Sequence, residues 1–493
     1  MIAQLLQPNV LIPWLLGMVF GIFVGATPGL TATMAVALIV PISFRLEPTA
    51  GLAMIIGVSF TAIFAGDIPA TFLRIPGTPA SAAATLDGYP MAQRGKGSLA
   101  LTLDLFCSAI GGLVGVGVLM LVAPPLASLA LEFSFCEMFW LAVLGLSLSA
   151  LVSTASVAKG WLAAILGMLL STIGIDIVRG VPRFTLGSEQ LMSGLDFIPV
   201  MIGLFGLSEV LRNVGSPTSS QGGKVAGSGR LPVKSAWLET LLHWPRVLAS
   251  ALAGTVIGAL PGAGADIAAW GAYGIAQKTS KKAGEFGTGI VEGVVAPTSA
   301  NNAAVAGAWI PALVFGIPGD AVTAIVLGAL MMYNIKPGPM IFEQSGGAID
   351  AIFAIAVVTQ FLLIPAGLAG IKAFGWIMRL PRGIIMTGVV VFSLVGAYSL
   401  RNNMFDVYVM VLFGVVGRIM ESRRIPLAPL ILGLILGPMV EENLRVGLIN
   451  SDGSLAPFFL RPISAVLVAV LVAIYIGPPL VRWIRERSAI TRT

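Results

Sequence analysis

Three aspartates stand beside proline- and glycine-rich interruptions of an otherwise apolar chain: Asp67, Asp266 and Asp320. A charge at membrane depth costs roughly 3 kcal/mol or more, so a carboxylate kept there is a functional candidate. Such a carboxylate could bind a coupling proton or Na⁺. The hydroxyls of Thr298 and Ser299 carry lone pairs that could complete an Na⁺ site. These five residues are the candidate ion-coupling residues, and helix capping is the alternative role of the aspartates.

Neutral amides accompany the carboxylates. Asn301 and Asn302 offer donors and acceptors that could hold a substrate carboxylate without the desolvation cost of a buried cation. Helix capping is again the alternative for the hydroxyl residues next to them. Arg74 follows Asp67 by seven residues, a spacing that places both on one face of a helix. We expect an ion pair between them, with substrate binding by Arg74 as the alternative.

Four proline–glycine steps must open the helices that position these groups: Pro28-Gly29, Pro76-Gly77, Pro261-Gly262 and Pro318-Gly319. Proline lacks an N–H and glycine tolerates unusual backbone angles, so each step is expected to unwind a helix. The N-termini of half-helices suit a carboxylate, and freed carbonyl groups suit a cation. The alternative is that the steps are hinges or packing kinks. The candidate substrate-binding residues are Thr27, Pro28, Gly29, Pro76, Gly77, Thr78, Ser81, Pro261, Gly262, Ala263, Gly264, Asn301, Asn302, Pro318 and Gly319.

The same signals occur twice along the chain. Gly25-Ala26-Thr27-Pro28-Gly29 resembles the segment 258–262, and the pair Ile68-Pro69-Ala70 and Ile75-Pro76-Gly77 returns with identical spacing at 310–312 and 317–319. Matching interruptions in two halves of a hydrophobic chain indicate a transporter's substrate site. We therefore predict an N-terminal repeat over residues 1–212, a Gly/Ser-rich linker over 213–235 and a C-terminal repeat over 236–493.

Composition places the chain in a lipid bilayer. Of its 493 residues, 57% are hydrophobic and 11% are charged, whereas soluble domains carry about 25% charged residues. The predicted fold is an all-α polytopic membrane protein of about 10–12 transmembrane helices, in two inverted repeats with broken or re-entrant hairpins at the Pro-Gly motifs. Asn9–Ala26 is expected to be a retained first helix, not a cleaved signal peptide. The basic linker and the basic C-terminal tail both favour the cytoplasmic side, which conflicts with simple inversion.

Several classes of function are disfavoured. The net charge of +6 comes from Lys and Arg in short loops, which indicates topology control and not nucleic-acid binding. Neither a P-loop nor a G-x-S-x-G motif is present, and one His with two Cys makes no catalytic or metal cluster. We expect no enzyme activity, no cofactor and no metal beyond a coupling Na⁺. A passive channel is the alternative class, and it would show flux without an ion gradient.

At these residues the chain resembles the large membrane subunit of bacterial tripartite tricarboxylate transporters over nearly its whole length. The matching motifs are Thr27-Pro28-Gly29-Leu30, Leu86-Asp87-Gly88-Tyr89, Gly180-Val181-Pro182-Arg183-Phe184, Leu260-Pro261-Gly262-Ala263-Gly264, Ser299-Ala300-Asn301-Asn302-Ala303-Ala304, Gly316-Ile317-Pro318-Gly319 and Arg461-Pro462-Ile463-Ser464.

The resemblance implies a multi-pass secondary transporter of the bacterial cytoplasmic (inner) membrane that imports an organic carboxylate with Na⁺ or H⁺. It also implies two partners, a small membrane subunit and a periplasmic substrate-binding protein. Some positions depart from the family pattern: Thr298 stands where Glu is usual, Asp266 and Asp320 stand where hydroxyl residues are common, and Asp67, Pro69 and Arg74 replace small polar residues. These departures leave the carboxylate and the coupling ion open, with an ion-coupled transporter of a non-carboxylate solute as a further alternative.

Overall fold

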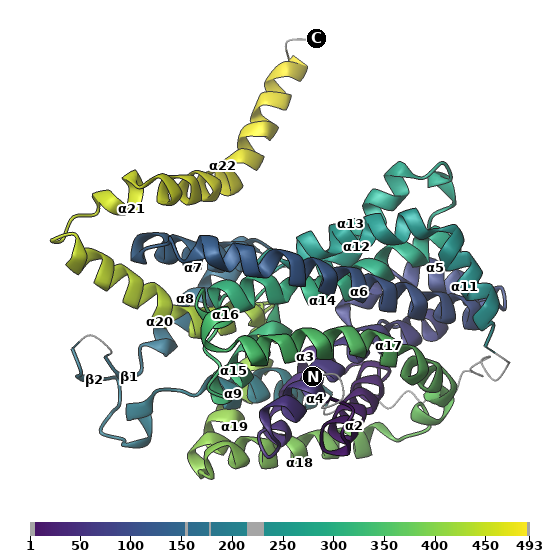
Figure 1. Cartoon of the computed structure of the whole chain (residues 1–493), viewed down its shortest axis with the longest axis horizontal. Coiled ribbons are helices and arrows are strands. Elements are labelled where there is room, and N and C mark those ends of the chain that lie inside the picture. Colours follow the sequence, from purple (N-terminus) through teal and green to yellow (C-terminus); the bar gives the residue numbers. More distant parts are fainter. Residues whose placement is uncertain (1–4, 153–155, 177–178, 214–230, 491–493) are drawn as a thin grey trace.

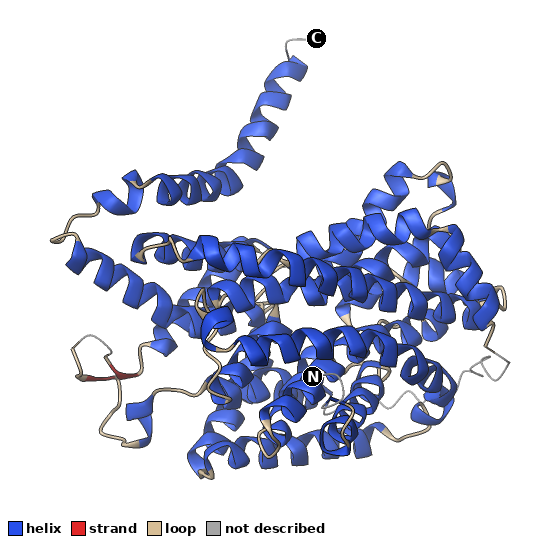
Figure 2. Ribbon diagram, viewed as in Figure 1, coloured by secondary structure: helices blue, strands red, loops and turns tan. Residues whose placement is uncertain are grey.

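Proline and glycine set most helix boundaries in the computed structural model, which describes residues 5–152, 156–176, 179–213 and 231–490. Helices form nearly all of the regular structure in these ranges (Figure 2), beside one antiparallel pair of two-residue strands. Six described helices are long and apolar enough to cross a membrane, and five further apolar helices are shorter. The expectation of a helical, polytopic membrane protein is therefore confirmed, while the predicted number of spans stays a prediction.

The elements follow one another along the chain as labelled in Figure 1. They are α2 (Pro8–Gly25), α3 (Ala32–Ser43), α4 (Pro48–Leu73), η1 (Pro79–Ala82), α5 (Thr85–Gln93), α6 (Gly97–Ala130), α7 (Phe135–Val152), α8 (Val157–Ser171), β1 (Gly174–Ile175), β2 (Pro182–Arg183), η2 (Gln190–Ser193), α9 (Phe197–Met201), the π-helical turn η3 (Ile202–Leu207), α10 (Ser208–Asn213), α11 (Val233–Leu242), α12 (Trp244–Gly258), α13 (Gly264–Thr279), η4 (Ala283–Glu285), α14 (Val291–Phe315), α15 (Ala321–Met332), α16 (Ile341–Gln344), α17 (Gly346–Ile377), α18 (Arg382–Arg401), α19 (Met404–Ser422), α20 (Leu427–Asn450), α21 (Ala456–Leu460) and α22 (Pro462–Ile490).

Each predicted step falls between helices. The chain is broken between α2 and α3, between α12 and α13, after α4 and after α14. The last two breaks share one local geometry: Arg74 and Gly316 end their helices with φ of 58° and 69°, and the N–H of the next residue reaches back to Pro69 or Pro311. Glycine suits this left-handed conformation, whereas arginine adopts it at some cost.

Small residues let the helices around these breaks approach closely. α2 packs along α4, and α12 packs along α14. A Cβ added to Gly25 would lie 3.0 Å from Ala62 Cα in α4, and one added to Gly258 would lie 2.6 Å from Ala304 Cα in α14. Side chains larger than hydrogen would push these backbones apart, which explains the glycines at the ends of α2 and α12.

The two long helices α6 and α17 connect these pairs. α6 packs against α14, and α17 packs against α4, so each contacts the helix pair that lies in the other half of the sequence. α20 similarly packs on α8, and α19 packs on η3 and α10. α22 packs on α7, and Figure 1 shows the C-terminal part of α22 extending away from the other helices.

The structure corrects one expectation and places two other segments. The stretch 296–302, which carries the paired asparagines, lies inside the continuous helix α14, which also accommodates Pro297 and Pro311. Arg74 does not pair with Asp67, because it ends α4 and its guanidinium lies 5.6 Å from the centre of the Tyr89 ring. Residues 214–230 of the predicted linker lie outside the described residues, and 233–235 belong to α11.

Asp87, from the motif Leu86-Asp87-Gly88-Tyr89, ties α5 to the start of α14. Its buried carboxylate accepts the N–H groups of Gly287 at 3.0 Å, Gly289 at 2.7 Å and Ile290 at 3.0 Å. The hydroxyl of Tyr273 donates to it at 2.9 Å. This carboxylate therefore orders the turn that leads into the helix with the paired asparagines.

We expect Asp87→Ala to destabilise the protein by on the order of 3 kcal/mol, because it leaves several donors without an acceptor and each costs about 1–3 kcal/mol when buried. The measurement is the thermal unfolding midpoint of the purified protein in detergent. Glu285→Ala, at an exposed position of the same turn, is the control and should leave the midpoint unchanged. An unchanged midpoint in Asp87→Ala would show that this turn does not depend on the carboxylate.

Candidate functional site

A cavity of about 490 Å³ lies where the four breaks converge. Its wall includes Thr31 and Thr33 at the start of α3, Gly264–Asp266 at the start of α13 and Asp320–Val322 at the start of α15. Thr78, at the start of η1, is also part of the wall. The rest of the wall includes residues of α10, η3 and the connection between α19 and α20. The cavity therefore joins segments from both halves of the sequence.

Three α-helices begin at this cavity. α3 is capped by Thr31, whose hydroxyl accepts the N–H of Met34 at 3.2 Å. α15 is capped by Asp320, whose carboxylate accepts the N–H of Thr323 at 2.8 Å while the Thr323 hydroxyl accepts the N–H of Asp320 at 2.9 Å. α13 begins at Gly264, which has a φ of 59°. N-terminal N–H groups and the helix dipole make such a convergence favourable to an anion.

The ionisable side chains that line the cavity are mainly acidic. Asp266, Asp320, Glu209 and Glu421 contribute carboxylates, and Arg212 contributes the guanidinium on the described part of the wall. Arg212 Nη2 lies 2.7 Å from Glu209 Oε1, and about half of the arginine side chain is exposed. An anion that enters is therefore attracted by the helix N-termini and repelled by these carboxylates.

Backbone hydrogen bonds fix two of the proline–glycine steps, and some of the residues beside the steps line the cavity. The Gly262 N–H donates to the Gly319 carbonyl at 2.7 Å, and the Gly77 N–H donates to the Gly66 carbonyl at 3.0 Å. Among the predicted substrate residues, Thr78, Gly262, Ala263 and Gly264 lie on the cavity wall. The other predicted residues of the steps are neighbours of wall residues in the sequence but are not themselves part of the wall: Thr27, Pro28, Gly29, Pro76, Gly77, Pro261, Pro318 and Gly319.

The remaining predicted polar residues form a separate, buried group. Ser81, Thr298, Ser299, Asn301 and Asn302 are all fully buried and do not line the cavity. Asn301 Nδ2 donates to Asp67 Oδ2 at 3.2 Å, and the hydroxyls of Thr298 and Ser299 donate to carbonyls one turn earlier in α14. Of the predicted ion-coupling residues, Asp266 and Asp320 therefore lie at the cavity and the other three lie in this group.

Three charged residues of the cavity wall were missed in the sequence. Glu209, Arg212 and Glu421 lie near the ends of α10 and α19. A charge at the end of an apolar segment is the usual topology signal, so neither residue type nor position distinguishes these three. Asp104 was missed as well, although a lone aspartate within the apolar stretch 97–130 is a signal that could have identified it.

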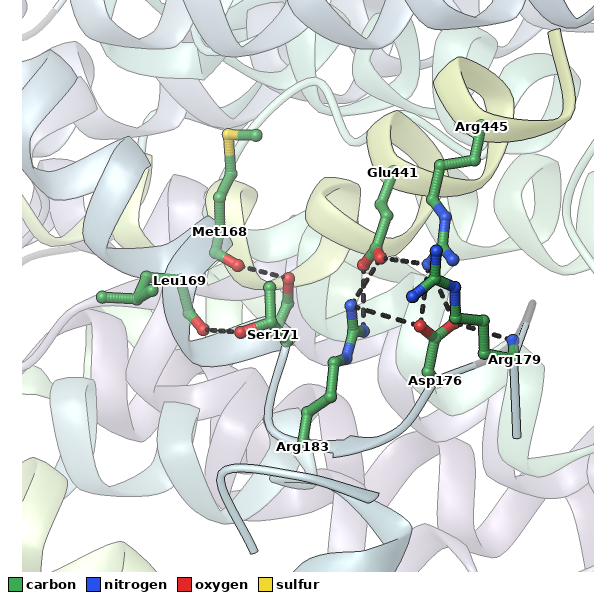
Figure 3. Close-up of polar contacts among 9 residues, drawn as sticks. Met168, Leu169, Ser171, Asp176, Arg179, Arg183, Glu441 and Arg445 are labelled. Carbon is green, nitrogen blue, oxygen red and sulfur yellow. Dashed lines mark hydrogen bonds and ion pairs between the residues drawn. The ribbon is translucent and has the colours of Figure 1, made fainter. Parts of the chain in front are cut away.

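A second charged cluster fixes the strand pair against α20 (Figure 3), and none of its residues lines the cavity. Arg183, from the motif at 180–184, makes a two-pronged contact with Glu441 at 2.6 and 3.0 Å. Arg445 lies 2.8 Å from Asp176 and 2.9 Å from Glu441. The hydrogen bonds to Glu441 raise the pKa of Arg183, so it stays charged in the cluster. These geometries indicate a structural role for the motif.

Comparison with known proteins identifies the family. Residues 11–432 match the family described as "Tripartite tricarboxylate transporter TctA family". A relative from Agrobacterium vitis, named as an uncharacterized 52.8 kDa protein in the TAR-I ttuC' 3'region, is 35% identical over 458 residues, which cover 92% of this chain and 90% of the relative. A second, named as an uncharacterized protein in the TAR-II ttuC' 3'region of the same organism, is 36% identical over 217 residues, which are 44% of this chain and 90% of that relative.

No solved structure matches the chain. The family match spans most of the sequence, including α3, α13, α15 and the other helices that build the cavity. The chain therefore belongs to the tripartite tricarboxylate transporter TctA family.

Proposed function

We propose that this membrane transport component imports an organic carboxylate, which binds in the cavity between α3, α13 and α15. The observation that carries this proposal is the convergence of three helix N-termini and Arg212 on one cavity of about 490 Å³. That volume suits a small di- or tricarboxylate, because small-molecule sites are typically about 300–1,000 Å³. The substrate carboxylates would take N–H groups at the helix N-termini and the guanidinium of Arg212.

The acidic wall implies that a cation enters with the carboxylate. Asp266 and Asp320 lie close enough to interact with each other electrostatically, and both would repel a substrate anion. Binding of Na⁺ or H⁺ would offset that repulsion, so the anion and the cation would favour each other's binding. A secondary transporter driven by a Na⁺ or H⁺ gradient follows from this coupling, and the family membership supports it.

Two related halves are part of the proposal. Gly77 and Gly319 occupy corresponding places. A Cβ added to Gly77 would lie 2.7 Å from Gly66 Cα and would also contact a carbonyl at the end of α2. A Cβ added to Gly319 would lie 2.6 Å from Ala308 Cα and would also contact a carbonyl at the end of α12. This correspondence supports an inverted repeat with hairpins that meet across the cavity. We propose that one set of helices moves against the other to expose the cavity alternately to the two sides.

The partners and location are part of the same proposal. Membership of a tripartite family supports a small membrane subunit and a periplasmic substrate-binding protein as partners, in a bacterial inner membrane. Binding-protein dependence would distinguish this transporter from a passive channel, which should conduct without the soluble partner.

A second candidate function is favoured by the charges of the cavity. Four carboxylates face one guanidinium on its described wall, and a solute with an ammonium group would be attracted by this excess. Transport of a cationic or zwitterionic solute in place of an organic acid is therefore the alternative.

Arg212 provides the first test. We expect Arg212→Gln to lower citrate or succinate uptake tenfold or more in vesicles that carry both membrane subunits and the binding protein, because a hydrogen bond to a charged group is worth about 1.5–3 kcal/mol. Uptake of each radiolabelled acid is measured per molecule of transporter. Arg423→Gln, at an exposed position directly after α19, is the matched control. Unchanged uptake in Arg212→Gln, or uptake of putrescine but of neither acid by the unmodified protein, would contradict the carboxylate assignment.

A further inference from the structure

Two carboxylates lie buried together between α4, α6 and α14, away from the cavity wall. Asp67 of α4 and Asp104 of α6 are 0% and 1% exposed and are close enough to interact electrostatically. Asn301 of α14 donates to Asp67 at 3.2 Å. Ser108 of α6 donates to Asp104 Oδ1 at 3.0 Å and lies 3.4 Å from the Thr298 carbonyl. Asn301 follows Thr298 by three residues, so one face of α14 meets both carboxylates.

Three oxygens of this group have no hydrogen-bond partner. They are Asp67 Oδ1, Asp104 Oδ2 and Asn301 Oδ1. Because the amide nitrogen of Asn301 binds Asp67, this fully buried amide is directed at the carboxylate pair. Buried polar atoms in native proteins almost always have a partner, so three acceptors without a donor point to a missing ligand that accepts lone pairs.

The charge balance points to the same ligand. Among the described residues, no Lys, Arg or His forms an ion pair with Asp67 or Asp104. Two uncompensated carboxylates at this depth would be strongly unfavourable. A cation surrounded by these oxygens would offset one of the two negative charges and would use the free lone pairs, because hard cations prefer oxygen ligands.

We propose that Asp67, Asp104 and Asn301 form a binding site for one Na⁺ ion. A divalent ion fits less well: Ca²⁺ takes six to eight oxygens and Mg²⁺ dehydrates reluctantly, whereas this group offers few ligands and no solvent. The carbonyl of Thr298 lies beside Ser108 and is a further candidate ligand.

Neighbouring polar side chains connect this site to the cavity. Thr78 lies on the cavity wall, its hydroxyl is 2.8 Å from that of Ser81, and Ser81 is close enough to Asp67 to stabilise its charge. A cation that fixes Asp67 would thereby fix Ser81 and Thr78 beside the substrate. The inference rests on the proposed function for its role in coupling, but Na⁺ binding itself can be tested without transport.

The test measures binding of ²²Na⁺ to the purified chain in detergent, together with its thermal midpoint in NaCl, KCl or choline chloride at equal ionic strength. We expect saturable ²²Na⁺ binding and a midpoint that rises with NaCl alone. Asp104→Asn, which keeps an acceptor for Ser108, should weaken Na⁺ binding at least tenfold. Asp350→Asn, exposed on α17, should bind Na⁺ like the unmodified protein.

Ser81→Ala gives a second test that does not remove a ligand. It should keep Na⁺ binding but lose most of the dependence of citrate affinity on Na⁺. Equal stabilisation by all three salts, stabilisation by acidification alone, or unchanged ²²Na⁺ affinity in both Asp104→Asn and Asp67→Asn would overturn the Na⁺ site. Na⁺ binding without uptake of any carboxylate would keep the site and contradict the proposed function instead.

Discussion

Alanine in place of Gly319 is expected to reduce uptake at least tenfold per correctly inserted molecule. The new Cβ would lie 2.6 Å from Ala308 Cα and 2.7 Å from the Gly258 carbonyl oxygen. Both neighbours are helix backbone, which cannot rotate away as a side chain can, and overpacking of this kind costs about 1–3 kcal/mol. The hairpin would open at the Gly262–Gly319 hydrogen bond, and the start of α15 would move at the cavity wall.

Gly77→Ala should have a similar effect, because its Cβ would lie 2.7 Å from Gly66 Cα. Gly274→Ala is the control: it lies in α13, and no atom outside its own helix turn comes within 4 Å of an added Cβ. It should transport normally and gain up to about 1 kcal/mol of helix stability. Uptake and surface abundance are measured together. Tolerance of alanine at both Gly77 and Gly319 would show that tight hairpin closure is not required.

The helix breaks could be predicted because proline and glycine act locally. The missing N–H at Pro318 and the left-handed conformation of Gly316 favour the end of a helix through local geometry. The capping role of Asp320 is local in the same way, and it was the alternative considered for that residue. Local rules failed at Pro297, where the helix continues because close neighbours on α6 and α12 hold α14 along its length.

The direction of side chains depends on non-local packing and could not be predicted. Asn301 contacts Asp67 and not the cavity because of how α14 is rotated against α4, and no local pattern in the sequence specifies that rotation. Arg212 and Glu421 both line the cavity although about 200 residues separate them. Both residues reach the cavity because α19 packs on η3 and α10, and these elements are brought together only when the chain folds.

The final prediction concerns the acidic wall and separates the two candidate functions. We expect the double variant Asp266→Asn, Asp320→Asn to bind citrate at least tenfold more tightly than the unmodified protein when Na⁺ is replaced by choline. Two unit charges about 8 Å apart at an effective dielectric constant of about 20 interact by about 2 kcal/mol, so removal of each carboxylate removes a comparable repulsion. Asparagine is also an effective N-cap, so α15 should keep its start.

At saturating Na⁺ the two proteins should bind citrate with more similar affinities, because bound cations already offset part of the repulsion in the unmodified cavity. Asp350→Asn again controls for removal of a charge far from the wall. The measurement is competition of citrate or putrescine with a radiolabelled probe on the purified chain, at low and high Na⁺. If the double variant lost its affinity for putrescine and gained none for citrate, the carboxylates would be direct ligands of an ammonium group. The cavity would then be selective for cations, and the helix N-termini would serve only to order Asp266 and Asp320 beside that solute.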